Sequence, residues 1–142
     1  MTTPPDLIRL VYISRNLLPP AEREAAVLDI LAASRRRNPA VGVTGALLFS
    51  DDCFAQSLEG PMAAVEALFE HIQMDERHDQ VVVLEAGPIS QRDFGDWSMG
   101  FAGHSTEASL RFDALVATPS QSSGRVLDVL RGAVGRTTPA MA

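Results

Sequence analysis

A single polar residue in an apolar segment places the strongest constraint on how this chain folds. Residues 53–60 read Cys-Phe-Ala-Gln-Ser-Leu-Glu-Gly, and the alternation of a β-strand puts Phe54, Gln56 and Leu58 on one face. Phe54 and Leu58 are large and apolar, so this face is expected to be buried together with the Gln56 amide. A buried amide without partners costs about 1–3 kcal/mol. We therefore expect the core to accommodate something polar and planar beside Gln56.

The charge balance argues against nucleic acid as a partner. The chain has 142 residues, of which 46% are hydrophobic, enough for the core of one globular domain. Its 18 acidic and 12 basic residues give a net charge of −6. An acidic protein is repelled by a phosphate backbone, so we expect no direct nucleic-acid contact.

The sequence shows neither a leader pattern nor a membrane anchor. Residues 1–6 are not a basic stretch followed by an apolar run, and no other segment approaches the roughly 18 apolar residues of a membrane helix. The single cysteine, Cys53, has no internal disulfide partner, and the three histidines lack the spacing of zinc ligands. We expect a cytoplasmic protein without a metal, in which Cys53 is buried and inert.

Alternating hydrophobic patterns predict the element order β-α-β-β-α-β-β. Strands are predicted at residues 7–14, 41–50, 53–59, 80–84 and 97–101, with helices at residues 19–36 and 61–73. This order is that of a ferredoxin-like α+β fold with one extra strand, in which both helices pack on one face of a mixed sheet. Pro39 is expected to end the first helix, and the Val-rich run at 80–84 is typical of a central strand.

The opposite face of the sheet carries too much apolar surface to remain exposed. Val11 and Ile13 are among the residues predicted to point to this side. The C-terminal part of the chain offers a cover, with helical spacing at residues 110–116 and 125–134 and a Ser-rich linker at 119–124. We expect two short helices there, which cover this face, a dimer contact surface, or both.

Several polar side chains are predicted to meet on the helix-covered face. Tyr12, Gln56, Trp97 and Met99 are expected to point there from strands, with Trp97 and Met99 on one face of the last strand together with Phe101. The first helix would deliver Ser34 and Asn38 to the same region, and Ile30 and Phe54 could pack on the faces of a flat ring. Each residue alone has an ordinary explanation as a core, turn or surface residue. Together they indicate a slot for an aromatic heterocycle.

The order and spacing of six segments resemble the BLUF domain, a family of blue-light sensors that bind flavin. The matching segments are residues 10–14, 34–38, 42–45, 54–60, 75–78 and 94–99. The resemblance extends over residues 7–103, so it implies a flavin-binding domain at residues 1–103 and a helical extension at 104–142. We expect the end of this extension, residues 137–142, to be frayed.

The resemblance also implies a role for each matching residue. Tyr12 would be the photoactive tyrosine, Gln56 the glutamine that bridges it to the flavin, and Trp97 and Met99 the pair that exchanges places near Gln56. Residues matching flavin-contacting positions are Ile30, Ser34, Asn38, Phe54, Gln56, Arg77 and His78. The family's usual cofactor is FAD, although FMN or riboflavin would fit the same ring pocket. Whether Trp97 or Met99 faces the flavin is left open by the sequence.

The function implied by the resemblance is light sensing and not catalysis. Light would drive reversible electron and proton transfer from Tyr12 via Gln56, and the altered hydrogen bonds would signal through the last strand and the C-terminal helices. No motif of an output enzyme follows residue 103, so the chain resembles short, stand-alone BLUF proteins, which signal as homo-oligomers or to a separate protein partner. Two alternatives remain: an acylphosphatase-like hydrolase on the same fold, and an interaction module with a vestigial pocket.

Overall fold

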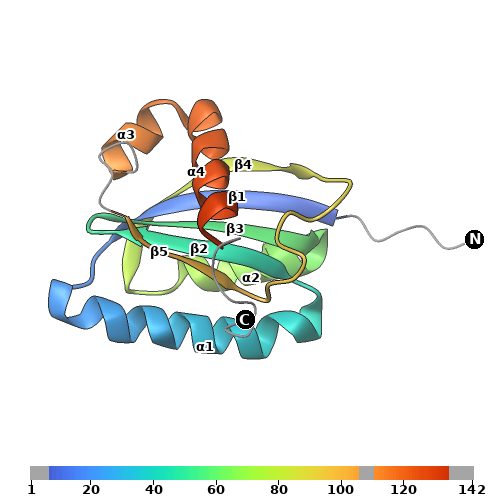
Figure 1. Ribbon diagram of the computed structural model, residues 1–142, viewed down its shortest axis with the longest axis horizontal. Helices are drawn as coiled ribbons and strands as arrows, with labels where there is room; N and C mark the ends of the chain where they lie inside the picture. Colours follow the sequence, from blue (N-terminus) through green and yellow to red (C-terminus); the bar gives the residue numbers. More distant parts are fainter. Residues whose placement is uncertain (1–6, 106–110, 135–142) are drawn as a thin grey trace, which may run out of the picture.

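A five-stranded mixed sheet lies between two layers of helices (Figure 1). The structure is a computed structural model that describes residues 7–105 and 111–134. The strands are β1 (Leu7–Asn16), β2 (Thr44–Ser50), β3 (Cys53–Pro61), β4 (His78–Pro88) and β5 (Gly100–Ser105). The helices are the 3₁₀ turn η1 (Pro20–Glu22), α1 (Arg23–Val41), α2 (Met62–Gln73), α3 (Phe112–Ala117) and α4 (Pro119–Val134). The sheet order is β4-β1-β3-β2-β5, which confirms the ferredoxin-like plan with one added strand.

The sheet separates two buried clusters of apolar side chains. β1 and β3 pair antiparallel, and Tyr12 lies directly opposite Gln56 in their register. The inner cluster, on the side of α1 and α2, contains Leu10, Tyr12, Val27, Leu31, Phe54, Leu58, Val65 and Met99. The outer cluster, on the side of α3 and α4, contains Val11, Ile13, Ala55, Phe94, Trp97, Leu115, Leu127 and Leu130. Neighbouring residues of β1 and β3 thus alternate between the clusters, as the period of two predicted.

α1 continues past Pro39, so the prediction that Pro39 ends this helix is wrong. The helix ends at Val41, and Gly42 follows with a φ of 73°, a left-handed conformation that glycine adopts without strain. The Val43 N–H then donates to the Asn38 carbonyl at 3.0 Å. Glycine at this position, and not proline, ends the helix and satisfies its last carbonyls.

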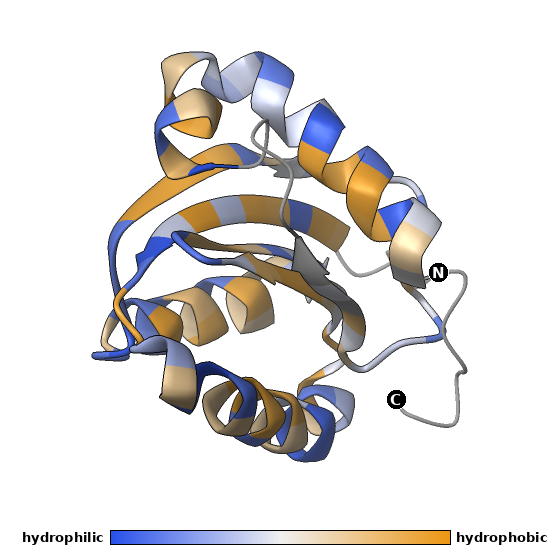
Figure 2. Cartoon of the chain, turned by 60° about the vertical axis from the view of Figure 1, so that its left-hand side comes forward, coloured by the Kyte–Doolittle hydropathy of each residue, from blue (hydrophilic) through white to orange (hydrophobic). Residues whose placement is uncertain are grey.

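The outer face is covered by the C-terminal helices, as expected. Figure 2 shows helices on both sides of a sheet whose strands are largely hydrophobic. The predicted linker at residues 119–124 is instead the first part of α4, which begins at Pro119. Proline suits the first turn of a helix, and the buried Ser122 hydroxyl donates to the Leu115 carbonyl of α3 at 2.8 Å. The predictions for Leu110 and residues 137–142 lie outside the described residues.

Two strand predictions also need correction. β4 pairs with β1 and lies at the edge of the sheet, not at its centre. Val81 packs on the inner cluster and Val82 on the outer one, whereas Val83 is 42% exposed, as suits an edge strand. β5 begins at Gly100, so residues 97–99 precede the strand instead of forming its start. Across the described ranges, we find no helix with both the length and the hydropathy needed to span a membrane.

Candidate functional site

A cavity lies between the inner face of the sheet and the helices α1 and α2. Its predicted lining residues are Tyr12, Ile30, Ser34, Phe54, Gln56, Arg77 and His78, all of which the structure places there. Apolar walls come from Leu47, Leu68 and Ile72, and further polar groups from Arg37, His71 and Asp75. Such a mixture of apolar walls and a few polar groups is typical of a small-molecule site. Asn38, Trp97 and Met99 were also predicted here but do not line the cavity.

The buried pair of Tyr12 and Gln56 faces this cavity. The Tyr12 hydroxyl donates to Gln56 Oε1 over 2.5 Å, and each residue is only 4% exposed. Burial, assisted by the negative charge of Asp75, raises the pKa of Tyr12, so the phenol stays neutral and keeps its proton as a donor. Gln56 Nε2 donates to the Met99 sulfur at 3.4 Å. An amide nitrogen carries two hydrogens, so this contact leaves one for a group in the cavity.

The three residues 97–99 are each held by a hydrogen bond to their carbonyl group. The Gly45 N–H donates to Trp97 O at 3.1 Å, Asn38 Nδ2 to Ser98 O at 2.7 Å, and Arg35 Nε to Met99 O at 3.1 Å. On its other side Gly45 packs closely against β3, where an added Cβ would collide with the Ser57 carbonyl oxygen. We refer to residues 97–99 as the 97–99 segment.

Trp97 and Met99 point to opposite sides of the sheet, which corrects the prediction that they share one face. Met99 is fully buried in the inner cluster beside Gln56, whereas Trp97 lies in the outer cluster. The alternation of a strand does not apply, because both residues precede β5. In this structure it is therefore Met99 that contacts Gln56.

Asn38 and Arg37 each bring a buried polar atom without a partner to the end of α1. Asn38 is fully buried, and its Oδ1 has no hydrogen-bond donor among the described residues. Arg37 lines the cavity, and its Nε likewise lacks an acceptor within the described part of the chain. Buried polar groups are almost always paired. Arg15 Nε and Ser57 Oγ on the outer face are also unpaired within the described residues, but the atoms of Arg37 and Asn38 stand out because Arg37 lines the cavity and Asn38 follows it in the chain.

His78 uses both ring nitrogens within the protein. Nε2 lies 2.7 Å from the Ile72 carbonyl oxygen, which can only accept, so Nε2 carries a hydrogen. Nδ1 lies 2.6 Å from the Ser14 hydroxyl and accepts its hydrogen in the neutral ring. The imidazole stands edge-on to the Tyr12 and Phe54 rings, at 6.3 and 6.2 Å. His78 therefore offers ring surface to the cavity and positions its neighbours.

Arg77 lines the cavity, and two carboxylates compensate its positive charge. Its Nη2 lies 2.6 Å from Asp75 Oδ2, and its Nη1 lies 3.0 Å from Asp29 Oδ2. The hydrogen bond with Asp75 raises the pKa of Arg77 and lowers that of Asp75. Both groups therefore stay charged over the whole neutral range.

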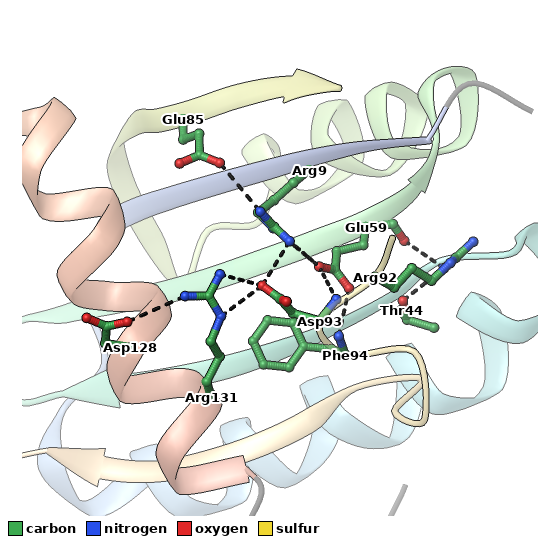
Figure 3. Close-up of polar contacts among 9 residues, drawn as sticks. All are labelled: Arg9, Thr44, Glu59, Glu85, Arg92, Asp93, Phe94, Asp128 and Arg131. Atoms are coloured by element: carbon green, nitrogen blue, oxygen red, sulfur yellow. Dashed lines mark hydrogen bonds and ion pairs between the residues drawn. The ribbon is translucent and has the colours of Figure 1, made fainter. Parts of the chain in front are cut away.

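A second buried polar network lies on the outer face of the sheet (Figure 3). The Glu59 side chain, fully buried, accepts hydrogen bonds from Arg9 Nη2 at 3.0 Å and from the backbone N–H groups of Asp93 and Phe94, both at 2.9 Å. Asp93 Oδ2 in turn binds Arg9 Nη2 at 2.9 Å and Arg131 Nε of α4 at 2.8 Å. This network ties the loop before the 97–99 segment to the central strands and to α4.

The sequence of residues 7–100 matches the BLUF family, described as sensors of blue light using FAD. The chain belongs to the BLUF family. Among curated proteins, it is 34% identical over 94 residues to the photoactivated adenylate cyclase subunit beta of Euglena longa and 36% identical over 93 residues to the subunit alpha of Euglena gracilis. Each match covers 66% of this chain but only 11% and 9% of these relatives, so the chain spans about a tenth of their length.

Solved BLUF structures share the fold of this chain. The dark-state structure of the BLUF protein BlrB has a TM-score of 0.72 at 33% identity, covering 92% of this chain and 96% of BlrB. The ground state of BlsA has a TM-score of 0.76 at 29% identity, covering 88% of this chain and 87% of BlsA. The BLUF region is thus a flavin-binding blue-light sensor and not an enzyme. Membership of this family favours the light sensor over the hydrolase and the plain interaction module.

The unpaired atoms of this BLUF domain fit the polar edge of a flavin. That edge carries carbonyl acceptors and an N–H donor, and the ring behind it is flat and apolar on both faces. Asn38 Oδ1 lacks a donor and Arg37 Nε lacks an acceptor among the described residues. A flavin edge offers an N–H group that can donate to Asn38 Oδ1 and a carbonyl oxygen that can accept from Arg37 Nε.

Sequence reasoning missed several residues that shape the BLUF site. Asp75, His71 and Arg37 line the cavity, and none was given a role from the sequence. Arg35 also went unnoticed, although it lies three residues before Asn38 and therefore on the same side of the helix. That spacing was the one signal in the sequence that could have found it.

Proposed function

We propose that the light response of this BLUF domain begins in the Tyr12–Gln56 pair. The observation that carries the proposal is the buried 2.5 Å hydrogen bond from the Tyr12 hydroxyl to Gln56 Oε1, at the wall of the cavity. When bound, a flavin supplies absorption of blue light and an excited state that accepts an electron. Tyr12 is suited to give up that electron because a neutral phenol can release a proton at the same time.

The proton leaves along the hydrogen bond that already exists. Oxidation makes the phenol O–H strongly acidic, and Gln56 Oε1 is the acceptor in line with it. Tyr12 regains both the electron and the proton afterwards, so no net chemistry remains. What persists is the Gln56 amide in a changed orientation or tautomer, and the altered hydrogen bonding gives a small red shift of the absorption band.

Met99 is placed to respond to the state of Gln56. The thioether accepts a hydrogen bond from Nε2 in the present arrangement. If the amide rotates, its oxygen faces the sulfur instead, and sulfur has no hydrogen to donate. The Gln56–Met99 contact then weakens, and the 97–99 segment is biased toward another position.

The flavin would be held from both ends of the cavity. We propose that Asn38 and Ser34 bind its polar edge, that Ile30, Phe54 and His78 pack against the ring, and that Arg77 lies beside the flavin side chain. FAD is the proposed cofactor, following the family's description. FMN and riboflavin carry the same ring and would make the same ring contacts. Their shorter side chains would leave no unpaired charge at Arg77, because Asp75 and Asp29 already compensate it.

The signal would leave through the outer face of the sheet. Trp97 shares the outer cluster with Leu127 and Leu130 of α4, and Asp93 binds Arg131 of the same helix. We propose that residues 1–103 form the light-sensing domain and that residues 104–142 carry its signal to a second copy or a separate protein partner. Movement of the 97–99 segment would change how α4 packs on the sheet.

An absorption spectrum recorded before and after blue illumination tests the proposal. The wild-type protein is expected to show a flavin band that shifts to the red and recovers in darkness. Tyr12→Phe and Gln56→Leu keep the side-chain volume but remove the proton path, so both should bind flavin and lose the shift. The flavin-to-protein ratio serves as the control for an intact site. A normal light-induced shift in either variant would refute this mechanism.

A further inference from the structure

Arg35 makes a contact that the proposed photocycle does not use. It leaves α1 beside the cavity, but its Nε is directed at the backbone oxygen of Met99, 3.1 Å away. Its sequence neighbours behave differently: Arg36 is exposed, and Arg37 lines the cavity. Arg35 is thus the arginine of this run that binds the 97–99 segment.

We propose that Arg35 is the positioning residue that keeps Met99, and not Trp97, against Gln56. The two side chains lie two residues apart on opposite sides of the sheet. A rotation of the backbone between them would change which one reaches Gln56. Such a rotation must redirect the Met99 carbonyl, and the hydrogen bond from Arg35 opposes this.

The other two hydrogen bonds to the 97–99 segment are made to the carbonyl groups of other residues. The Gly45 N–H binds the carbonyl of Trp97, and Asn38 binds that of Ser98. Arg35 binds the backbone of Met99 itself, the residue whose sulfur contacts Gln56. Its hydrogen bond is charge-assisted, which makes it roughly twice as strong as a neutral one. Partial burial lowers the pKa of Arg35, yet an arginine remains charged in proteins.

The consequence for signalling rests on the proposed function: Arg35 would set how readily the 97–99 segment moves once Gln56 has changed. The positioning itself exists in darkness and can be tested there. Two probes are available, because the chain has a single tryptophan and because the Gly45 N–H is bonded to Trp97 O.

The experiment compares Arg35→Met with Arg36→Met in the flavin-loaded protein kept dark. Methionine keeps an unbranched apolar stem and removes the donor. Hydrogen exchange of the Gly45 amide, followed by NMR, reports how often the segment opens. Loss of a charged hydrogen bond is expected to raise this rate about tenfold or more in Arg35→Met, and to leave it within about twofold of wild type in the exposed Arg36→Met variant. The single Trp97 indole N–H resonance should shift or split in Arg35→Met only.

Two further variants keep the test decisive. Arg35→Lys retains a charged donor and should exchange at a rate between wild type and Arg35→Met. Arg35→Gln replaces Arg35→Met if the latter does not fold; its amide is still a donor but is shorter and uncharged, so a smaller acceleration is expected. Wild-type exchange and an unchanged indole resonance in the folded Met or Gln variant would overturn the inference. A wild-type protein without a light-induced red shift would instead refute the proposed function and leave this result standing.

Discussion

Each face of the sheet buries a fully enclosed polar side chain, Glu59 on the outer face and Asn38 on the inner one, and the two are satisfied differently. On the outer face, the fully buried Glu59 carboxylate is surrounded by Arg9 and by two backbone N–H groups. On the inner face, the equally buried Asn38 keeps an oxygen without a donor among the described residues. Both sites lie at the same depth in one small domain.

Arg15 Nε and Ser57 Oγ on the outer face also lack a partner among the described residues, so the binding site is marked by the unpaired atoms at the end of α1 together with the cavity that Arg37 lines. A buried charge whose hydrogen bonds are all made within the protein needs nothing more, so Glu59 serves to fix the loop that leads to the 97–99 segment. A buried acceptor without a donor is costly unless something else supplies one. Removing Glu59 should therefore lower the free energy of unfolding, whereas removing Asn38 should mainly weaken flavin binding.

Glu59→Leu is expected to have the largest effect on stability. It leaves the Arg9 guanidinium partly buried without its main partner and two N–H groups of the loop without an acceptor. Breaking such a buried pair costs about 3–5 kcal/mol, measurable as a lower free energy of unfolding in urea. Glu85→Gln removes an exposed partner of Arg9 at 3.8 Å and serves as the control. A cost below about 1 kcal/mol for Glu59→Leu would contradict the structural role.

Cys53 on the outer face should make the protein less stable at alkaline pH. Burial raises the pKa of its thiol to about 11 from the ordinary value of 9.0. Between these values the unfolded chain loses the proton and the folded protein keeps it, so stability falls as the pH rises from about 9 to 11. Linkage gives a loss of about 2–3 kcal/mol.

Urea unfolding at pH 8 and pH 11 checks this loss. The sequence contains no lysine, but Tyr12, whose pKa burial also raises, begins to lose its proton in the unfolded chain in this window and adds to the loss in both wild type and Cys53→Ala. Cys53→Ala should show a smaller loss of stability than wild type over the same pH range. Parallel losses in the two proteins would indicate that the thiol is not the group responsible.

Asn38→Ala tests the inner face. It removes the unpaired acceptor and the bond to Ser98 O. We expect flavin affinity to fall about tenfold to a hundredfold, the effect of about 1–3 kcal/mol, seen as a lower flavin-to-protein ratio and a weaker Kd by flavin fluorescence. Ala40→Gly, at an exposed position of the same helix end, is the control for helix damage. Unchanged flavin affinity in Asn38→Ala would remove the distinction between the two faces.

Arg131→Met is expected to have the smallest effect on stability. The Arg131 side chain is 43% exposed, and surface ion pairs contribute at most about 1 kcal/mol. Its loss should nevertheless loosen the link from Asp93 to α4 and reduce the light-dependent change in hydrogen exchange of this helix. Asp128→Asn removes the other partner of Arg131 and should leave that change intact. Equal light responses of α4 in both variants would exclude the Asp93–Arg131 link from the signal route.

The sequence was sufficient wherever a local rule decided the structure. The period of two assigned Phe54, Gln56 and Leu58 to one face, and the hairpin and strand order then brought Gln56 opposite Tyr12. The residues of the first helix that we propose to contact the flavin were predicted from one helical stripe; Ile30 and Ser34 of this stripe line the cavity, and Asn38 does not. The function was predicted from the family resemblance, because hydrophobic periodicity alone indicates secondary structure and not activity.

Long-range contacts decided the features that the sequence did not predict. The Val-rich β4 was expected at the centre of the sheet, but its neighbours depend on chain crossovers and not on its own residues. Residues 119–124 contain turn-forming serines, yet packing against α3 and the sheet holds them in a helix. Trp97 and Met99 diverge because three carbonyl contacts from β2 and α1 fix a segment that is not a strand.

The packing at Gly45 has a consequence for the geometry of signalling. β2 and β3 approach so closely there that no side chain fits, and the same residue holds the Trp97 carbonyl. One end of the 97–99 segment is therefore fastened to β2 at Gly45, while at its other end Met99 is bound by Arg35 and leads directly into β5, which pairs with β2 from Gly100 onward. A rearrangement of the segment is therefore confined to the few backbone bonds between these two attachments to β2, beside Gln56.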